Sequence, residues 1–398
     1  MTDRRLRVGV AGLGRAFTLM LPTLGSDPRV ELVAAADLRS DATQRFAAEF
    51  GARRYATIEE LCADRDVEVV YVATPHQHHS AHAVMAVQHG KHVLVEKPMA
   101  ISIEECSRMI DAAERAGVVL IVGHSHSFDR PILRTRELIA GGAFGPVRMI
   151  NAQYYTDFLY RPRRREELET KAGGGVVFSQ AAHQVDIVRL LGGGRPVSVR
   201  AFTAAWDLAR PTEGAYAALL NFADGGFASL VYSGYGHFDG DEFCLGLSEL
   251  GQEKEHNTYG GARRRLRLVG SPEDEAALKQ VRNYGGADYS GSATQAADRW
   301  HEHFGLVIVS CERADLRPMP NGVMVYDDNQ ASWEPLAKPF VPRAEVIDEL
   351  YAAIVDGRKP LHDGRWAMAT LEVCLAMLQS VSEGAEIALK HQVAVPDH

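Results

Sequence analysis

The stretch 6-LRVGVAGLGRAFTLMLPTLG-25 decides the fold of this chain. Its first six residues suit a short buried strand, and Gly12 and Gly14 then lead into an amphipathic run that can form a helix despite Pro22. Strand, glycine turn and helix in this order are typical of a dinucleotide-binding unit. Gly12 permits the tight turn, Gly14 lets a pyrophosphate approach the backbone, and the helix N-terminus offers unsatisfied N–H groups to the anion.

The glycine pattern is incomplete, because position 17 of the G-x-G-x-x-G motif holds Phe17. Asp37 ends the next predicted strand, about 20 residues on, where such folds place the acid that holds a ribose 2′-hydroxyl. A carboxylate repels a 2′-phosphate, which favours NAD, but Arg39 could pair with that phosphate and keeps NADP open. The predicted cofactor loop comprises Gly12, Gly14, Arg15, Ala16, Phe17, Asp37 and Arg39.

Strands and helices continue to alternate over residues 1–125, which predicts a doubly wound parallel sheet. Beyond residue 125, long stretches such as "GAYAALLNFADGGFASLVYSGYG" indicate a largely antiparallel sheet. The predicted fold class is therefore α/β: an N-terminal Rossmann domain in 1–125, and an α+β domain with a large, mostly antiparallel sheet in 126–398. We expect this second domain to carry an insertion at 238–300 and C-terminal helices at 343–356 and 363–383.

The composition points to a small-molecule partner. The 398 residues are 46% hydrophobic and 24% charged, with a net charge of −9, so the chain has no electrostatic reason to bind nucleic acid or an anionic membrane. No run approaches the roughly 18 apolar residues of a membrane span, and five scattered cysteines argue against a disulfide framework. We expect a cytoplasmic protein, and a homo-oligomer (dimer or tetramer) that uses the exposed side of the second sheet.

A histidine cluster, 74-TPHQHHSAH-82, follows the fourth predicted strand. Ligands of an open α/β sheet bind at the carboxyl ends of its strands, so the first histidines border the cofactor while later ones lie on a helix. His78 and His82 are spaced as a helical metal pair would be. No acid or cysteine lies among them, so the sequence favours surface histidines over a metal site.

The stretch 69-VVYVATPHQHHSAHAVMAVQHGKHVLVEKP-98 resembles the signature of the Gfo/Idh/MocA oxidoreductases. The resemblance implies a nicotinamide-side loop at Thr74, Pro75, His76 and His79, an E-K-P step at Glu96 and Lys97, and Lys97 as the active-site lysine. Independently, a lysine beside a proline at the carboxyl end of a strand lies near the cofactor, where its ammonium can stabilise a developing alkoxide.

The segment 171-KAGGGVVFSQAAHQVDIVRLLGGG-194 predicts a loop followed by a helix that carries His183 and Asp186 on one side. It resembles the family's G-G-G-x-x-x-D-x-G-x-H-x-x-D helix, which implies that His183 exchanges the hydroxyl proton. An imidazole suits that task because its pKa of about 6.5 is close to working pH. The family aspartate is replaced by Ser179, so we expect a different substrate geometry or proton route, with Gln180 as the candidate to replace its hydrogen bonds.

Shorter stretches, "GHSHSFDRP" among them, resemble a family branch described as 4,5-dihydroxyphthalate (cis-dihydrodiol) dehydrogenases and glycoside 3-dehydrogenases. The run "YRPRRREELE" contains four arginines that could bind a carboxylate of such a substrate: Arg161, Arg163, Arg164 and Arg165. Because Glu166, Glu167 and Glu169 follow at once, the sequence favours a solvated helix start over this role. His124 and His126 are candidates to bind substrate hydroxyls or, with His183, a metal. We expect no metal, because no acid completes the set.

Together these features predict an NAD(P)-dependent oxidoreductase that moves a hydride between a ring secondary alcohol and nicotinamide. Catalysis is assigned to Lys97 and His183, and substrate binding to His124, His126, Arg161, Ser179, Gln180 and Asp186. One alternative is a cyclitol or glycoside 3-hydroxyl dehydrogenase. Another is an inactive dinucleotide-binding sensor, which Ser179 supports and the presence of both Lys97 and His183 opposes.

Overall fold

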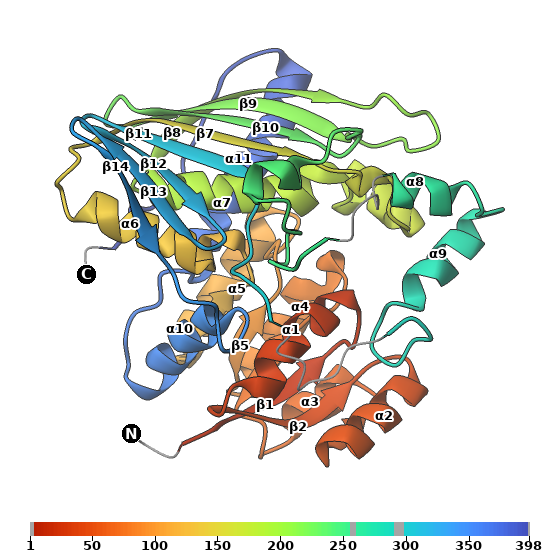
Figure 1. The fold of residues 1–398 in the computed structure, drawn as a ribbon. Coiled ribbons are helices and arrows are strands. Elements are labelled where there is room, and N and C mark those ends of the chain that lie inside the picture. The colour runs from red at the N-terminus through yellow and green to blue at the C-terminus, as the bar shows by residue number, and fades with distance from the viewer. Residues whose placement is uncertain (1–3, 255–259, 290–297, 397–398) are drawn as a thin grey trace. The chain divides into compact units, whose positions relative to one another are not determined.

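The computed structural model describes residues 4–254, 260–289 and 298–396 (Figure 1). It divides into two compact units: unit 1 is Met1–His124, Ala277–Ala297 and Phe340–Met368, and unit 2 is Ser125–Ala276, Asp298–Pro339 and Ala369–His398. The sequence places everything after residue 125 in one second domain. The compact units instead assign two later segments of the chain to the N-terminal unit.

Unit 1 is built on a six-stranded sheet with the order β3-β2-β1-β4-β5-β6, and every neighbouring pair is parallel. The predicted Rossmann sheet is thereby confirmed. Its strands are β1 (Leu6–Ala11), β2 (Val30–Ala36), β3 (Arg53–Tyr55), β4 (Val69–Val72), β5 (His92–Val95) and β6 (Leu120–Val122). Its helices are α1 (Arg15–Ser26), α2 (Ser40–Phe50), α3 (Ile58–Ala63), α4 (His79–Gln88), α5 (Ile103–Ala116) and α10 (Ala344–Val355).

Local signals in the sequence set the ends of these helices. Thr57 and Glu60 form a capping box at the start of α3, in which each side chain accepts the backbone N–H of the other. Ser102 caps α5 by accepting the N–H of Glu105. Gly51 and Gly117 end α2 and α5 with positive φ, a conformation that L side chains rarely adopt.

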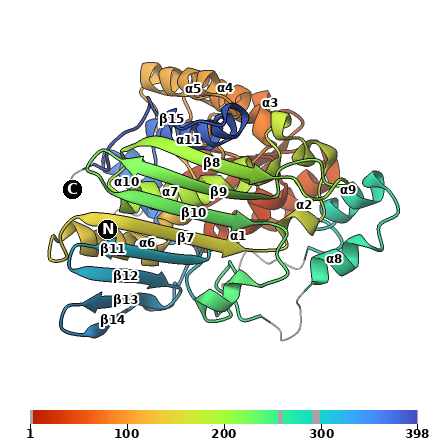
Figure 2. The ribbon, with the colours of Figure 1, turned by 90° about the horizontal axis from the view of Figure 1, so that it is seen from above.

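Unit 2 contains a nine-stranded sheet with the order β14-β13-β12-β11-β7-β10-β9-β8-β15 (Figure 2). Only the neighbours β7 and β10 run parallel, so the predicted mostly antiparallel sheet is confirmed. The strands are β7 (Val147–Tyr155), β8 (Pro196–Ala204), β9 (Ala215–Phe222), β10 (Phe227–Ser233), β11 (Leu306–Cys311), β12 (Ala314–Met319), β13 (Gly322–Asp327), β14 (Ala331–Pro335) and β15 (Ile387–Ala388).

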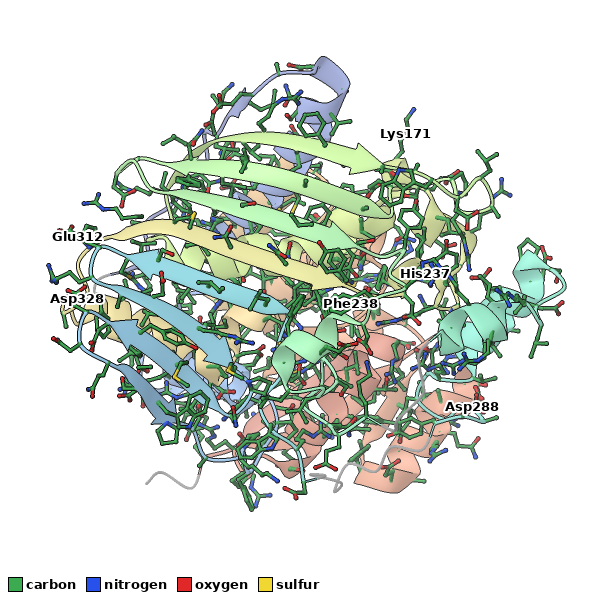
Figure 3. The ribbon with its side chains drawn as sticks, turned by 45° about the horizontal axis from the view of Figure 1, so that its top comes forward. Lys171, His237, Phe238, Asp288, Glu312 and Asp328 are labelled. Atoms are coloured by element: carbon green, nitrogen blue, oxygen red, sulfur yellow. The ribbon has the colours of Figure 1, made fainter. Side chains whose placement is uncertain are left out.

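One face of this sheet is covered by helices and the other is open. Helix α6 (Arg130–Ala140) packs on β12 and β13, and α7 (Ala182–Leu191), buried along its whole length, packs on β7 and β10. Along β9, burial alternates so that Leu220 lies inside while Leu219 is 52% exposed. Figure 3 shows the outer side of the sheet, with Glu312 and Asp328 at its hairpin turns. The long helix α11 (Gly364–Glu383) and α10 occupy the two predicted C-terminal helical ranges.

The predicted insertion stands between β10 and β11 and contributes to both units. It carries the short helices α8 (Gly261–Leu266) and α9 (Pro272–Gln280), while residues 255–259 and 290–297 lie outside the described part. From Ala277 onward it belongs to unit 1, where the ring of Tyr284 meets those of Phe17 and Phe46 at 5.4 and 6.1 Å between centroids. Within the described residues, no helix is long and apolar enough to span a membrane.

Candidate active site

The glycine turn of unit 1 fits a pyrophosphate. Gly12 has a φ of +96°, and a Cβ there would lie 2.9 Å from the carbonyl oxygen of Ala73, so only glycine lets β1 turn this close to the neighbouring strand. A Cβ on Gly14 would meet no atom within 4 Å, which leaves open space above its backbone. Gly14 also begins α1 without a side-chain cap. The backbone N–H groups there face the opening that an anion would occupy.

Asp37 and Arg39 form one hydrogen-bonded group with this turn. The Asp37 carboxylate accepts hydrogen bonds from the backbone N–H of Leu13 at 2.7 Å and of Arg39 at 2.8 Å. The Arg39 guanidinium also donates to this carboxylate, at 3.1 Å. Arg39 also donates to the carbonyl oxygens of Leu13 and Tyr284, at 2.7 and 3.0 Å. The structure therefore joins the acid and the arginine at the end of β2 to the glycine turn.

Three further residues were predicted in the cofactor loop. Arg15 and Ala16 are partly exposed on the first turn of α1, and Arg15 donates to the hydroxyl of Thr18 at 3.3 Å. Phe17 is a correction, because its side chain is completely buried against Phe46 and Tyr284. Position 17 lies on the inward side of the helix. The Phe17 ring fills space there that a glycine at this position would leave empty.

His79 ties the Thr74–Pro75 loop to the segment around Lys97. Its ring is completely buried, with Nδ1 2.9 Å from the carbonyl oxygen of Pro98 and Nε2 2.7 Å from that of Thr74. Burial lowers the pKa of this imidazole. His79 was predicted to line the cofactor. Because both ring nitrogens face backbone carbonyls, we correct that role to positioning the loop, while His76 stays partly exposed in the 3₁₀ turn His76–His78.

Glu96 also differs from its predicted cofactor-binding role. Its carboxylate is buried and accepts a hydrogen bond from the hydroxyl of Tyr71, in the middle of the sheet, at 2.5 Å. Burial raises the pKa of Glu96. The side chain thus anchors the end of β5 from inside. Lys97 stands between this anchor and Pro98, whose carbonyl binds His79, so its backbone is fixed from both sides.

In unit 2, His183 lies on α7 within a buried aromatic group. Its ring centroid is 4.7 Å from that of His126 and 5.0 Å from that of Phe304. The backbone N–H of His126 points at Nδ1 of His183 from 3.4 Å. A π-helical turn, Val177–Ala181, precedes α7, and such turns often occur at functional sites.

The predicted neighbours of His183 are mostly engaged with the protein. Ser179 donates its hydroxyl to the carbonyl oxygen of Gly175, and Gln180 accepts a hydrogen bond from Tyr232 at 3.2 Å. The buried carboxylate of Asp186 accepts hydrogen bonds from Ser127 and from Thr370, the latter at 2.7 Å, and so braces α7.

His126 stands between carboxylates that sequence reasoning did not find. Nδ1 is 2.6 Å from Asp129 and Nε2 is 3.5 Å from Glu249. Burial opposes protonation of His126, but the two acids outweigh it and raise its pKa to about 9. Asp129, three residues after His126, could have been inferred from the "GHSHSFDRP" pattern. Glu249 comes from the insertion, and nothing in the sequence links it to His126.

Two arginines flank the ring of Phe158. Arg161 donates to Asp157 at 3.2 Å and lies 3.9 Å from Glu249. Arg163, from the same arginine run, stacks on Phe158 with its guanidinium carbon 3.6 Å from the ring centre. Burial lowers its pKa to about 10, and its buried Nε has no hydrogen-bond partner. Of the four arginines in this run, Arg165 is exposed and the other three are partly exposed.

Comparison with known proteins agrees with both halves of this arrangement. Residues 6–124 match the model of an oxidoreductase family with an NAD-binding Rossmann fold, and residues 132–245 match the GFO/IDH/MocA C-terminal domain. The 1-carboxy-3-chloro-3,4-dihydroxycyclohexa-1,5-diene dehydrogenase of Comamonas testosteroni is 49% identical over 94% of each chain.

Two further proteins illustrate the range of the similarity. A crystal structure of a Bordetella bronchiseptica RB50 protein described as a dehydrogenase superposes with a TM-score of 0.90, at 44% identity, over 96% of this chain and 100% of that one. The glucose-6-phosphate 3-dehydrogenase of Bacillus subtilis (strain 168) is 30% identical over 46% of this chain and 51% of its own length.

A prediction follows from His82, whose Nδ1 lies 2.9 Å from the hydroxyl of Thr74. Burial, together with His78 and His79, lowers its pKa to about 4. As the pH falls from about 6.5 to about 4, His82 becomes protonated in the unfolded chain but stays neutral in the native state. The free energy of unfolding should therefore decrease over this pH range. The free energy of unfolding, measured by urea denaturation, should decrease less between about pH 7 and about pH 5 in His82→Gln than in the unmodified protein.

The matched control is His89→Gln, which removes an exposed histidine from the end of the same helix. It should keep the pH dependence of the unmodified protein. An equal pH dependence in both variants would show that the environment of His82 has no effect on stability.

Proposed function

This chain belongs to the Gfo/Idh/MocA family of oxidoreductases, and from that premise we propose that it dehydrogenates a dihydroxylated cyclohexadiene that carries a carboxylate. The observation that carries this proposal is the pair Arg161 and Arg163 beside Phe158, in the unit that also holds His183. The related enzyme from Comamonas testosteroni is named for a carboxylated ring diol. Arginine is the side chain best suited to bind such a group.

In the proposed reaction Lys97 and His183 act on one hydroxyl of the ring. NAD, when bound, would supply the acceptor for the hydride of the carbon that bears this hydroxyl. His183 takes the hydroxyl proton, and the Lys97 ammonium stabilises the alkoxide while it forms.

We further propose that Arg161 and Arg163 bind the substrate carboxylate. Arg163 retains an unused, buried Nε–H, and the nearby charge of Arg161 helps to depress its pKa, after burial. A carboxylate would satisfy that donor and balance the two positive charges. Gln180, Ser179, His124 and His126 are proposed to surround the rest of the ring.

The sugar-oxidising alternative has less support. Family members that act on polyols use an aspartate at the position of Ser179, and here the hydroxyl of Ser179 is bound to the carbonyl oxygen of Gly175. The chain therefore lacks a carboxylate there to hold a polyol hydroxyl. The sugar-phosphate relative matches only about half of this chain, which leaves a glycoside or cyclitol as the second candidate substrate class.

We propose NAD as the cofactor in preference to NADP. Asp37 would lie beside the ribose 2′-hydroxyl, where its charge repels a 2′-phosphate. Arg39 is the residue that could pair with such a phosphate, but its guanidinium donates hydrogen bonds to Asp37 and to two backbone carbonyls. Gly12, Gly14, Arg15 and Ala16 would hold the pyrophosphate, and Thr74, Pro75 and His76 would border the nicotinamide.

We also propose that the open face of the nine-stranded sheet joins copies of this chain in a dimer or tetramer. Large apolar side chains on these strands are exposed in this single chain, and patches of that kind mark interfaces. They are Val197, Phe202, Leu219, Phe227, Tyr326 and Trp333. A reducing cytoplasm is the proposed location, because all five cysteines are thiols.

The first test of the reaction is Lys97→Ala. The variant should bind NADH as tightly as the unmodified protein, and both should bind NADPH more weakly, as measured by fluorescence titration. Its turnover of a carboxylated cis-dihydrodiol should fall by about a thousandfold or more, since a contact of the transition state is lost. Full turnover would exclude Lys97 from catalysis, and tighter binding of NADPH would reverse the cofactor assignment.

The second test concerns the substrate carboxylate. Arg163→Ala should raise KM for the carboxylated diol by about tenfold to a hundredfold, and leave KM for the same diol without its carboxylate nearly unchanged. Arg165→Ala is the matched control on the exposed side of the same run and should change neither value. Equal effects of Arg163→Ala on both substrates would indicate that the arginine only supports the fold.

The third test concerns assembly. Leu219→Asp places a charge in the centre of the open face and should convert the assembly to monomers in light scattering, because a buried unpaired charge is costly. Leu268→Asp changes a leucine that is 86% exposed in the insertion and should leave the mass unchanged. A monomeric unmodified protein would contradict the proposed assembly.

A further inference from the structure

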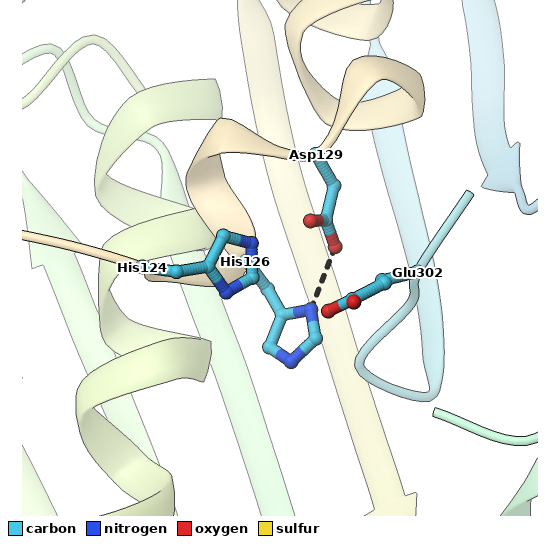
Figure 4. Close-up of side chains that lie close together, drawn as sticks. All are labelled: His124, His126, Asp129 and Glu302. Carbon is cyan, nitrogen blue, oxygen red and sulfur yellow. Dashed lines mark hydrogen bonds and ion pairs between the residues drawn. The ribbon is translucent and has the colours of Figure 1, made fainter. Parts of the chain in front are cut away.

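Two histidines and two acids lie close together at the start of α6 (Figure 4). One ligand atom from each of His124, His126, Asp129 and Glu302 lies within 4.8 Å of the others, and all four side chains are buried. His126, Asp129 and Glu302 belong to unit 2, and His124 precedes His126 by two residues. Burying two carboxylates together is costly unless a cation or several donors compensate their charges.

In the sequence, no acid next to His124 and His126 completes a metal-binding set. The structure supplies two acids. Asp129 follows His126 by one turn of chain, and Glu302 arrives from the segment before β11. Two imidazoles and two carboxylates are a donor set that first-row divalent ions accept.

We propose that His124, His126, Asp129 and Glu302 bind one divalent transition-metal ion of the Zn²⁺ type. Ligand atoms about 2.0–2.2 Å from such an ion stand about 3.3 Å apart in a tetrahedral site. The ligand atoms of the four residues now lie within 4.8 Å of one another, so the longest of these distances would have to shorten slightly. The 2.6 Å distance between Nδ1 of His126 and the Asp129 carboxylate would have to lengthen slightly. Nδ1 of His126 faces Asp129, so Nδ1 is the nitrogen that binds the ion.

The surroundings of His126 fit this role. Metal-bound histidines usually donate their second N–H to a carboxylate, which fixes the ring and its tautomer. Nε2 of His126 faces Glu249 at 3.5 Å, and Glu249 in turn lies 3.9 Å from Arg161. Ser125, between the two histidines in sequence, has a buried hydroxyl without a hydrogen-bond partner.

The proposed ion would lie next to the catalytic histidine, because the rings of His126 and His183 are 4.7 Å apart. An ion there would bind an oxygen of the substrate diol and lower the pKa of its hydroxyl. The existence of the metal site stands on the cluster alone, whereas this role toward substrate rests on the proposed function. In this arrangement His124 and His126 contact the substrate through the ion.

The test measures metal binding directly, without turnover. Untagged protein is treated with a chelator and titrated with Co²⁺, whose visible absorption reports its ligands, and with Zn²⁺ by calorimetry. We expect about one ion per chain. Glu302→Gln and Asp129→Asn should each weaken Co²⁺ binding by about a hundredfold or more, and Glu249→Gln by about tenfold to a hundredfold. NADH binding, measured in parallel, verifies that each variant is folded.

Two matched controls separate this site from others. Glu312→Gln removes an exposed acid at a hairpin turn, and His78→Gln removes the surface pair with His82. Both should bind Co²⁺ as the unmodified protein does. The proposal is overturned if the unmodified protein binds no stoichiometric Co²⁺ or Zn²⁺, if folded Glu302→Gln and Asp129→Asn retain full affinity, or if His78→Gln abolishes binding. None of these results depends on the identity of the substrate.

Discussion

The buried imidazole of His79 holds together the two segments on which the cofactor side of the site depends. It reaches the carbonyl oxygens of Thr74 and Pro98 at 2.7 and 2.9 Å, and so joins the loop after β4 to the residue that follows Lys97. Glu96 secures the same segment from within the sheet through Tyr71. A lysine with the catalytic role proposed for Lys97 would be positioned more accurately by a fixed backbone, because less motion remains to be lost in the transition state.

Carboxylates organise the substrate unit in a comparable way. Asp186 holds α7 in place through hydrogen bonds with Ser127 and Thr370, and thereby helps to position His183, which lies on the same helix. Asp129 and Glu249 orient His126 from its two nitrogens. Such buried polar groups are expensive to desolvate, and they persist where they fix a functional side chain in one orientation.

The replacement of an aspartate by Ser179 changes the chemistry available beside His183. Where polyol dehydrogenases of the family have a carboxylate, this chain has a hydroxyl that bonds to its own backbone. The negative charges near His126 come instead from Asp129, Glu249 and Glu302.

The sequence by itself determined the Rossmann sheet, the antiparallel sheet, the family and the positions of Lys97 and His183, because these follow from short periodicities and fixed spacings. It did not determine which side chains face inward. Phe17, Glu96 and Asp186 occupy positions that the sequence assigns to cofactor or substrate binding, but their side chains point toward the core or toward other residues of the protein. Nor did it bring Glu249 and Glu302 to His126, since these acids are far away in the chain. Only tertiary folding creates such contacts, because burial and pairing of charges depend on which segments pack together.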